Sequence, residues 1–125
     1  MILLLDAHAV LWWLADDAAL DAQARAAVAD PGNDVLVSAA TVWEIAIKRA
    51  LGKLDAPPGL ATIVEHSGID ILPITGADAE LAGGLPPHHR DPFDRMLVAQ
   101  ASRLSALLVT RDDAFAAYDV AVLKA

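Results

Sequence analysis

The sequence predicts an α/β fold, with a mostly parallel central sheet of about five strands and helices on both of its faces. Short apolar runs alternate with helical segments along the chain, which is typical of parallel strands joined by right-handed helical crossovers. The first run, Ile2 to Leu5, has no polar alternation, as expected for a strand covered on both faces. The chain has 125 residues, the length of a single domain, which we expect to span residues 1–125.

The strands are predicted from short apolar segments that follow turn residues. The run from Asp30 to Asn33 reads DPGN, which is typical of a turn, and an apolar segment comes directly after it. Isoleucines flank Asp70 on both sides, which favours a strand near the edge of the sheet. We expect strands at 2–5, 35–37, 69–74, 106–109 and 120–123.

Helices are predicted in the intervals between these strands. Leu20, Ala24 and Val28 fall on one helical face. Asp91 and Pro92 begin a strong helix, because Asp is favoured at the N-cap and Pro at the first helical position. The glycines and prolines of 83–87, just before it, favour a mobile loop. We expect helices at 8–14, 18–29, 41–50, 59–68, 77–81, 92–104 and 113–118.

The composition excludes several classes of protein. There is no cysteine, so disulfides, thiolate nucleophiles and thiolate-bound zinc are excluded. No apolar run approaches the ~18 residues that cross a bilayer, and the N-terminus lacks the basic cluster of a secretory signal. We therefore expect a cytoplasmic protein without membrane contact. The 56% of hydrophobic residues favours a well-covered core or an apolar face for a partner.

The net charge of −8 argues against nucleic-acid binding through general basicity. The basic residues are nevertheless concentrated in the chain, since seven of the nine lie between positions 48 and 111, interleaved with acids. A local basic rim around an acidic pocket is compatible with this distribution. These seven residues are Lys48, Arg49, Lys53, Arg90, Arg95, Arg103 and Arg111.

Polar residues follow three of the predicted strands. Asp6 ends the first strand, Ser38 the second, and Thr110 with Asp112 the fourth. Ligands of parallel sheets bind beyond the carboxyl ends of the strands. We therefore expect these side chains to meet at one edge of the sheet.

Each acid near this edge also has a structural explanation that the sequence leaves open. Asp6 and Asp112 could each cap the helix that follows. Glu44 completes a Thr-x-x-Glu capping box that starts at Thr41. Asp91 is explained by its N-cap position, and Asp94 lies at the third helical position, where acids are also common.

Taken together, the acids favour a metal site. Carboxylates that come from separate elements to one sheet edge would repel one another unless a cation lay between them, and oxygen ligands suit Mg²⁺ or Mn²⁺. Such a site can activate water and stabilise the charge that develops on a phosphate. The sequence leaves the choice between the two metals open.

The histidines and tryptophans remain ambiguous. His8 could contact substrate, orient an acid or be structural, and the loop residues His88 and His89 are either solvated or in contact with a phosphate or a metal. Base stacking is one use of the three tryptophans, although large aromatic side chains more often pack in cores or interfaces. The tryptophans are Trp12, Trp13 and Trp43.

Four segments in this order resemble PIN-domain nucleases, and more narrowly VapC-type toxins of type II toxin-antitoxin pairs. The resemblance runs the length of the chain, and no single segment would be specific alone. The matching segments are LLLDAH at 3–8 with LWWL at 11–14, VS at 37–38 with WEIAIK at 43–48, HRDPFDR at 89–95 with AQA at 99–101, and VTRD at 109–112.

The resemblance implies a metal-dependent endoribonuclease that uses Mg²⁺ or Mn²⁺. The four acids of the family fall on Asp6, Glu44, Asp94 and Asp112, with the metal held by the three aspartates and Glu44 completing the site. The partners it implies are an RNA substrate, a VapB-like antitoxin and a second copy of the chain. Auxiliary candidates are Asp91, Thr110, His8 and Ser38, and candidates for RNA contact are Arg90, Arg95, Arg111 and Lys48.

Two other interpretations remain. The family commonly has Thr after its first acid, where this chain has Ala7, so a weakly active or silent PIN scaffold that binds RNA or an antitoxin is one alternative. A phosphoacceptor signalling domain is the other. It would need a pair of acids after the first strand and a lysine after the last, whereas Asp6 is alone and Lys124 is one residue from the end.

Overall fold

The computed structural model describes residues 1–125 and has one five-stranded sheet in the order β3-β2-β1-β4-β5. Every neighbouring pair of strands is parallel, so the predicted parallel sheet is confirmed. The first strand of the chain lies at the centre of the sheet. The strands are β1 (Ile2–Leu5), β2 (Asp34–Ser38), β3 (Asp70–Leu72), β4 (Leu107–Thr110) and β5 (Val122–Lys124).

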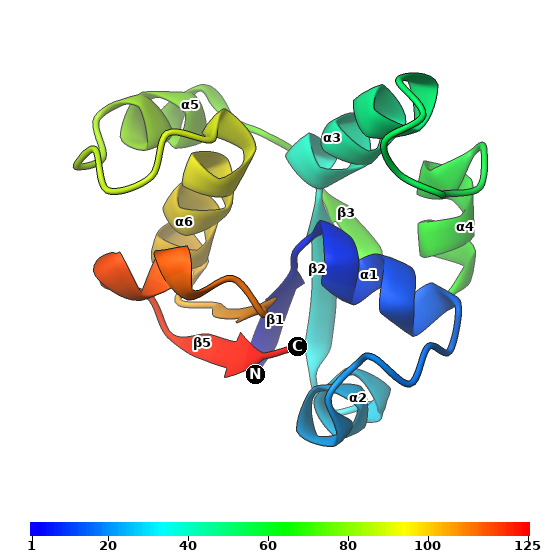
Figure 1. Cartoon of the computed structure of the whole chain (residues 1–125). Helices are drawn as coiled ribbons and strands as arrows, with labels where there is room; N and C mark the ends of the chain where they lie inside the picture. The colour runs from blue at the N-terminus through cyan, green and yellow to red at the C-terminus, as the bar shows by residue number, and fades with distance from the viewer.

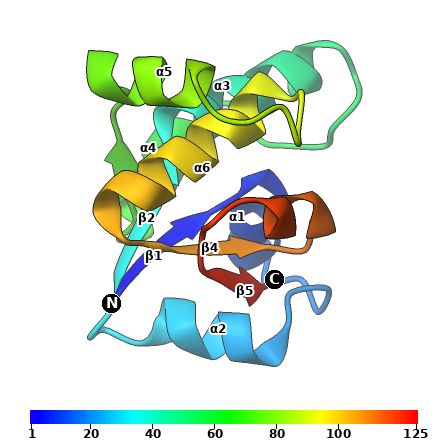
Figure 2. The same cartoon turned by 90° about the vertical axis from the view of Figure 1, so that its left-hand side faces the viewer.

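Helices cover both faces of the sheet, as predicted (Figure 1). One face carries α1, α2 and α4, and the other carries α6, with α5 packed on α6 away from the strands (Figure 2). The helix α3 contacts both α1 and α6 near the carboxyl ends of the strands. The helices are α1 (Ala7–Leu14), α2 (Ala22–Ala29), α3 (Ala39–Ala50), α4 (Leu60–His66), α5 (Gly76–Gly83), α6 (Pro92–Leu104) and the 3₁₀ helix η1 (Asp113–Ala117). None of them is both long and apolar enough to span a bilayer.

Alternate residues of β1 build the two halves of the core. Leu3 and Leu5 pack with residues of α1, α2 and α4, whereas Leu4 packs on the opposite face with Leu97 and Phe115. All three leucines are fully buried. This explains the unbroken apolar run, because a strand covered on both faces has no solvent side on which to place polar residues.

The predicted boundaries differ from the structure where a side chain caps a helix. The predicted helix at 18–29 begins only at Ala22, because Asp21 accepts a hydrogen bond from the Gln23 backbone N–H. The helix predicted at 77–81 is longer, since Thr75 and Asp78 form a capping box at its start. The strand predicted at 69–74 is reduced to three residues.

The capping box predicted at Thr41 and Glu44 is wrong. The helix α3 begins at Ala39, and Ser38 is its N-cap, accepting a hydrogen bond from the Ala40 backbone N–H at 3.1 Å. Thr41 and Glu44 therefore lie inside the helix, and the Thr41 hydroxyl has no hydrogen-bond partner. The structural explanation for Glu44 is lost with this correction.

Candidate active site

Asp6 and Thr110 meet at the carboxyl edge of the sheet, because β1 and β4 are neighbours. The Thr110 hydroxyl donates a hydrogen bond of 2.5 Å to Asp6 Oδ2 and accepts one from the Asp112 backbone N–H at 3.1 Å. The other carboxylate oxygen of Asp6 accepts a hydrogen bond from the Ala9 backbone N–H at 2.9 Å. Asp6 therefore caps α1, and Thr110 of the neighbouring strand β4 fixes the orientation of its carboxylate.

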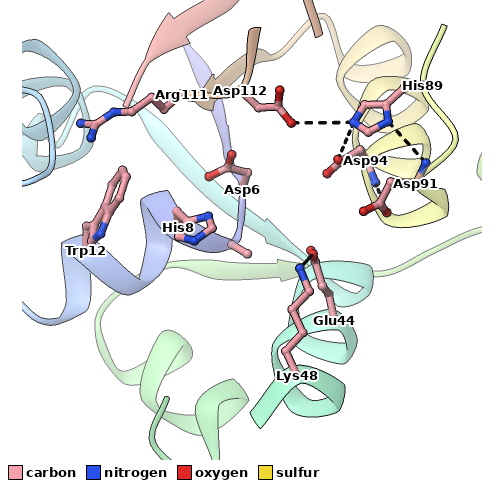
Figure 3. A pocket seen from close by; sticks show the side chains of 11 residues that line it. Asp6, His8, Trp12, Glu44, Lys48, His89, Asp91, Asp94, Arg111 and Asp112 are labelled. Atoms are coloured by element: carbon pink, nitrogen blue, oxygen red, sulfur yellow. Dashed lines mark hydrogen bonds and ion pairs between the residues drawn. The ribbon is translucent and has the colours of Figure 1, made fainter. Parts of the chain in front are cut away.

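A pocket of about 570 Å³ lies over this edge, and carboxylates dominate its lining. Figure 3 shows the side chains of Asp6, Asp94 and Asp112 around one open space, although they come from the ends of β1 and β4 and from the start of α6. Five carboxylates face only two permanently charged cations. The lining residues are Asp6, Ala7, His8, Trp12, Glu44, Lys48, His89, Asp91, Asp94, Arg111 and Asp112.

Glu44 enters this pocket from α3. Its side chain is only 8% exposed, and its Oε2 accepts a hydrogen bond from Lys48 Nζ at 2.7 Å, one helical turn away. This hydrogen bond raises the pKa of Lys48. Glu44 is therefore a buried acid that does not cap its helix and whose one partner is Lys48.

Asp91 and Asp94 have different environments although they begin the same helix. Asp91 is the N-cap of α6, since its Oδ1 accepts hydrogen bonds from the backbone N–H groups of Phe93 and Asp94. Asp94 makes no capping bond. Burial, followed by the nearby charge of Asp91, raises the pKa of Asp94 from its ordinary 3.8 to about 7.

The pKa of Asp6 is also raised, chiefly because burial removes water from its carboxylate. The hydrogen bonds from Thr110 and Ala9 act in the opposite direction and stabilise the charged form. Two carboxylates that resist ionisation therefore line the same pocket. A bound cation would remove both the repulsion and part of the cost of burial.

The side chains present fit a divalent cation. Oxygen atoms of Asp94 and Asp112 and a nitrogen of His89 lie within 4.8 Å of one another, and Asp6 lines the same space. Burial raises the pKa of both Asp6 and Asp94, and for Asp94 the nearby charge of Asp91 adds to it, as expected for carboxylates that lack a compensating charge. A set made mostly of carboxylates matches the hard cations Mg²⁺ and Mn²⁺.

His89, whose position the sequence left open, lies inside the pocket. Its Nε2 is 2.8 Å from Asp94 Oδ2 and 3.7 Å from Asp112 Oδ2. The shorter contact does not have the alignment of a hydrogen bond. The neighbouring His88 packs edge-on against Tyr118 and does not line the pocket.

The predicted basic rim is reduced to two residues, because most of the arginines bind the protein itself. Arg95 donates from α6 to five backbone carbonyl oxygens between Ala82 and His89. Arg49 donates to the Ala56 carbonyl, and Arg103 pairs with Asp78. Only Lys48 and Arg111 line the pocket, and the exposed Arg90 lies outside its lining.

Arg111 is held beside the pocket rather than free in solvent. Its guanidinium donates to the carbonyl oxygens of Ala125 and Ala19. It also lies 4.4 Å from the ring centre of Trp12 in a cation–π contact. Trp12 is thereby part of the pocket wall, together with the exposed His8, whose ring centre is 5.5 Å away.

The remaining candidates lie outside the lining of the pocket. Ser38 is fully buried and is explained by its capping of α3. Trp13 packs against the core cluster of β1 and α1. Trp43 is 62% exposed and contacts Phe93 edge-on, with 5.2 Å between the ring centres.

Residues 3–121 match the PIN domain family, whereas no curated protein matches the sequence. The fold is similar to VapBC2 from Rickettsia felis, solved with a DNA fragment from its promoter, with 13% identity, a TM-score of 0.72 and 98% of each chain covered.

Two further structures are similar over almost their whole length. VapBC-1 from nontypeable Haemophilus influenzae has 20% identity and a TM-score of 0.67, with 98% of this chain and 97% of that chain covered. A toxin-antitoxin complex from Klebsiella pneumoniae has 20% identity and a TM-score of 0.66, with 97% and 95% covered. At these identities the likeness shows a common fold, and the match to the family covers nearly the whole sequence. The chain belongs to the PIN domain family.

Proposed function

We propose that this chain is a metal-dependent endoribonuclease and the toxin of a type II toxin-antitoxin pair. The observation that carries the proposal is the meeting of Asp6, Asp94 and Asp112 in one pocket of a PIN fold, although three different elements supply them. Two of these carboxyls have raised pKa values. Helix capping uses one oxygen of Asp6 and one of Asp112, but it does not explain why three carboxylates share one pocket, an arrangement that costs free energy unless a cation is bound.

In this proposal Asp6, Asp94 and Asp112 hold Mg²⁺ or Mn²⁺, and Glu44 completes the site. The bound cation would supply an activated water and would neutralise charge on the phosphate that is cut. The chain itself orients the groups. Thr110 and the Ala9 N–H fix both oxygens of Asp6, and Lys48 holds Glu44 from one turn further along α3.

The charge balance of the pocket makes RNA binding dependent on the cation. Five carboxylates against two permanent cations would repel a phosphodiester until the metal is bound. Lys48 and Arg111 line the pocket and are placed to contact phosphates that flank the cut bond. Arg111 would do so through Nη1, which takes no part in its bonds to Ala125 and Ala19, and the exposed Arg90 would add a contact from the loop before α6. Arg95 is not proposed for this role, because its donors are used within the loop.

The partners we propose are a VapB-like antitoxin and a second copy of the chain, in the cytoplasm. The support is the nature of the similar structures, which are described as VapBC and toxin-antitoxin complexes. Large hydrophobic side chains such as Trp43, Leu51 and Leu81 are also exposed and would be covered in such assemblies.

The test is cleavage of a mixed cellular RNA pool by the purified protein with Mg²⁺, with Mn²⁺ and with EDTA. The key variant is Asp6→Asn, since Asn caps a helix about as well as Asp and α1 should stay intact. The matched control is Asp113→Asn, because Asp113 is exposed, follows a site residue directly and does not line the pocket.

Metal-dependent cutting that is lost in Asp6→Asn and kept in Asp113→Asn would support the nuclease and its site together. Cutting that survives Asp6→Asn, or that persists in EDTA, would contradict the site. Metal binding without any cutting would favour a scaffold that binds RNA or an antitoxin, as the missing hydroxyl at Ala7 allows.

A further inference from the structure

The position of the His89 imidazole is fixed by hydrogen bonds to the main chain of its loop, and these bonds do not depend on a ligand in the pocket. The His89 backbone N–H donates to the Tyr118 hydroxyl at 3.0 Å, and that hydroxyl donates to the Pro86 carbonyl at 2.8 Å. Arg95 donates to the carbonyls of Pro86 and His89 at 3.1 and 3.2 Å and to Leu85 at 2.8 Å. The loop therefore places the ring where it lies.

One hydrogen bond to the ring indicates which nitrogen carries the proton. The Asp91 backbone N–H donates to His89 Nδ1 at 3.4 Å. A backbone N–H can only donate, so Nδ1 offers its lone pair and the proton of the neutral ring is on Nε2. This nitrogen is the one that faces the carboxylates of Asp94 and Asp112 (Figure 3).

This arrangement is the reverse of that in histidines that bind metals. A metal-binding nitrogen uses its lone pair, and the other nitrogen then donates its N–H to a carboxylate or a carbonyl. Here Nδ1 already accepts a hydrogen bond, so a metal on Nε2 would require the ring to lose its proton or the Asp91 bond to break. The short distances between His89, Asp94 and Asp112 therefore do not make the histidine a ligand.

We propose that His89 is a positioning residue, whose Nε2–H is shared between Asp94 and Asp112 and holds these carboxylates toward the cation site. Nε2 lies 2.8 and 3.7 Å from one oxygen of each carboxylate and has no aligned hydrogen bond to either, so the N–H is close to both carboxylates without being committed to one of them. Asp6, Asp94 and Asp112 would then hold the cation through oxygen atoms alone. This inference rests on the proposed metal site but not on the identity of the RNA.

The first test reads the tautomer directly. Long-range ¹H–¹⁵N NMR spectra distinguish the two protonated forms of each imidazole, and the chain has only four histidines. His89→Gln identifies the His89 signals. We expect the Nε2–H form in metal-free protein and after addition of Mg²⁺ or Zn²⁺. An Nδ1–H form in metal-free protein, or loss of the Nε2 proton on metal addition, would overturn the proposal.

The second test measures Mn²⁺ and Zn²⁺ affinity by calorimetry in three variants. His89→Gln keeps a donor in place of Nε2 and should bind both ions nearly as tightly as the unchanged chain. His89→Leu removes the donor and should weaken both about 10- to 100-fold, the usual effect of losing a partner of a ligand. His66→Leu is the matched control, because His66 is exposed at the end of α4 and does not line the pocket, and it should have no effect.

Three results would contradict the proposal. Unchanged affinity in His89→Leu would show that the contact does not matter, and tighter binding would show that the imidazole competes with the cation. If His89→Leu lost Zn²⁺ binding but kept Mn²⁺ binding, His89 would be identified as a ligand. RNA is absent from both tests, so failure of cleavage would contradict the proposed function without affecting this result, and thermal unfolding of each variant identifies one that fails to fold.

Discussion

At the scale of single residues, Asp94 is a proposed metal ligand whose buried charge destabilises the metal-free fold. Its pKa is raised to about 7, first by burial and then by the charge of Asp91. Below pH 4 the carboxyl is protonated in both the folded and the unfolded chain. Between pH 4 and 7 the unfolded chain ionises while the folded chain keeps its proton, so the metal-free fold loses stability as the pH rises through this range.

Asp94→Asn should therefore melt at a higher temperature than the unchanged chain when both are free of metal at pH 8. The difference should shrink toward pH 4, because protonation removes the charge from Asp94 as the substitution does. Thermal unfolding across this pH range measures it, with Asp113→Asn as the control. If the difference in melting temperature did not depend on pH, the charge of Asp94 would not be its cause.

Asp91→Asn tests whether the first acid of α6 is more than a cap. Asn accepts the same backbone hydrogen bonds about as well as Asp, so the bonds to the N–H groups of Phe93 and Asp94 should persist. We expect RNA cleavage close to that of the unchanged chain, measured beside Asp94→Asn, which should be inactive. Equal loss in the two variants would assign Asp91 to the metal.

Sequence reasoning placed two of the candidate acids by topology, whereas Glu44 and Asp94 were assigned by the resemblance to PIN-domain nucleases. Asp6 and Asp112 come after strands that are neighbours in a parallel sheet, and this places them at one edge. His89 could not be placed in this way. Its location depends on Tyr118, 29 positions away, and on the path of an irregular loop. The surroundings of Arg95 could not be predicted for the same reason, because sequence does not show that carbonyl groups surround its guanidinium.

At the scale of elements, Arg95 joins the loop before α6 to the helix itself. It donates to five carbonyls between Ala82 and His89. This loop was predicted to be mobile from its glycines and prolines, whereas these bonds and Tyr118 tie its main chain to the body of the protein. Arg95 thereby acts on the site through the position of His89.

Arg95→Lys keeps the positive charge but loses the planar fork that reaches several acceptors. We expect a loss of about 1–3 kcal/mol in the free energy of unfolding, and faster hydrogen exchange at the amides of the loop. Chemical denaturation and exchange monitored by mass spectrometry measure both, with the exposed Arg90→Lys as the control. If hydrogen exchange of the loop were unchanged in Arg95→Lys but RNA binding were weaker, Arg95 would be identified as a phosphate contact.

Asp78 and Arg103 fasten α5 to α6. The Asp78 side chain is fully buried and lies 2.5 Å from the Arg103 guanidinium, while Gln100 adds a hydrogen bond at 3.3 Å. The bond from Arg103 lowers the pKa of Asp78 to about 2. The folded chain therefore keeps this charge when the unfolded chain has already been protonated.

The stabilisation from Asp78 should be complete above pH 4 and should disappear as the pH falls toward 2. Asp78→Asn should lower the free energy of unfolding by about 1–3 kcal/mol at neutral pH and should flatten the loss between pH 4 and 2. Urea unfolding at a series of pH values measures both effects. An equally steep acid loss in the variant would show that other carboxylates are responsible.

The positions of strands and helices could be predicted where the hydrophobic pattern determines them. The starts of helices were predicted less well where they depend on which residue caps the helix. The run Ile2 to Leu5 predicted a central strand, and its two faces are indeed both covered. The start of α3 was placed too late, because Thr41 and Glu44 match a capping box that Ser38 makes unnecessary. Two overlapping cap patterns cannot be ranked from spacing alone, since only the path of the preceding strand selects one of them.

At the scale of the whole molecule, the net charge of −8 and the acidic pocket point to the same dependence on cations. Mutual repulsion opposes folding in a chain with this excess of acids, and it is greatest where five carboxylates share one pocket. A divalent cation bound only by the folded state should therefore stabilise the entire domain, by an amount set by its concentration and affinity.

With free Mn²⁺ at one hundred times its dissociation constant, the gain should be about 2.7 kcal/mol, or roughly 10 °C in melting temperature for a domain of this size. Thermal unfolding of the unchanged chain in Mn²⁺ and in EDTA measures it. Asp6→Asn should lose most of the shift, while Asp113→Asn should keep it, because only the first variant alters a proposed ligand. An equal rise in melting temperature in all three proteins would mean that Mn²⁺ acts by general screening of the acidic surface. The pocket would then not be a specific cation site.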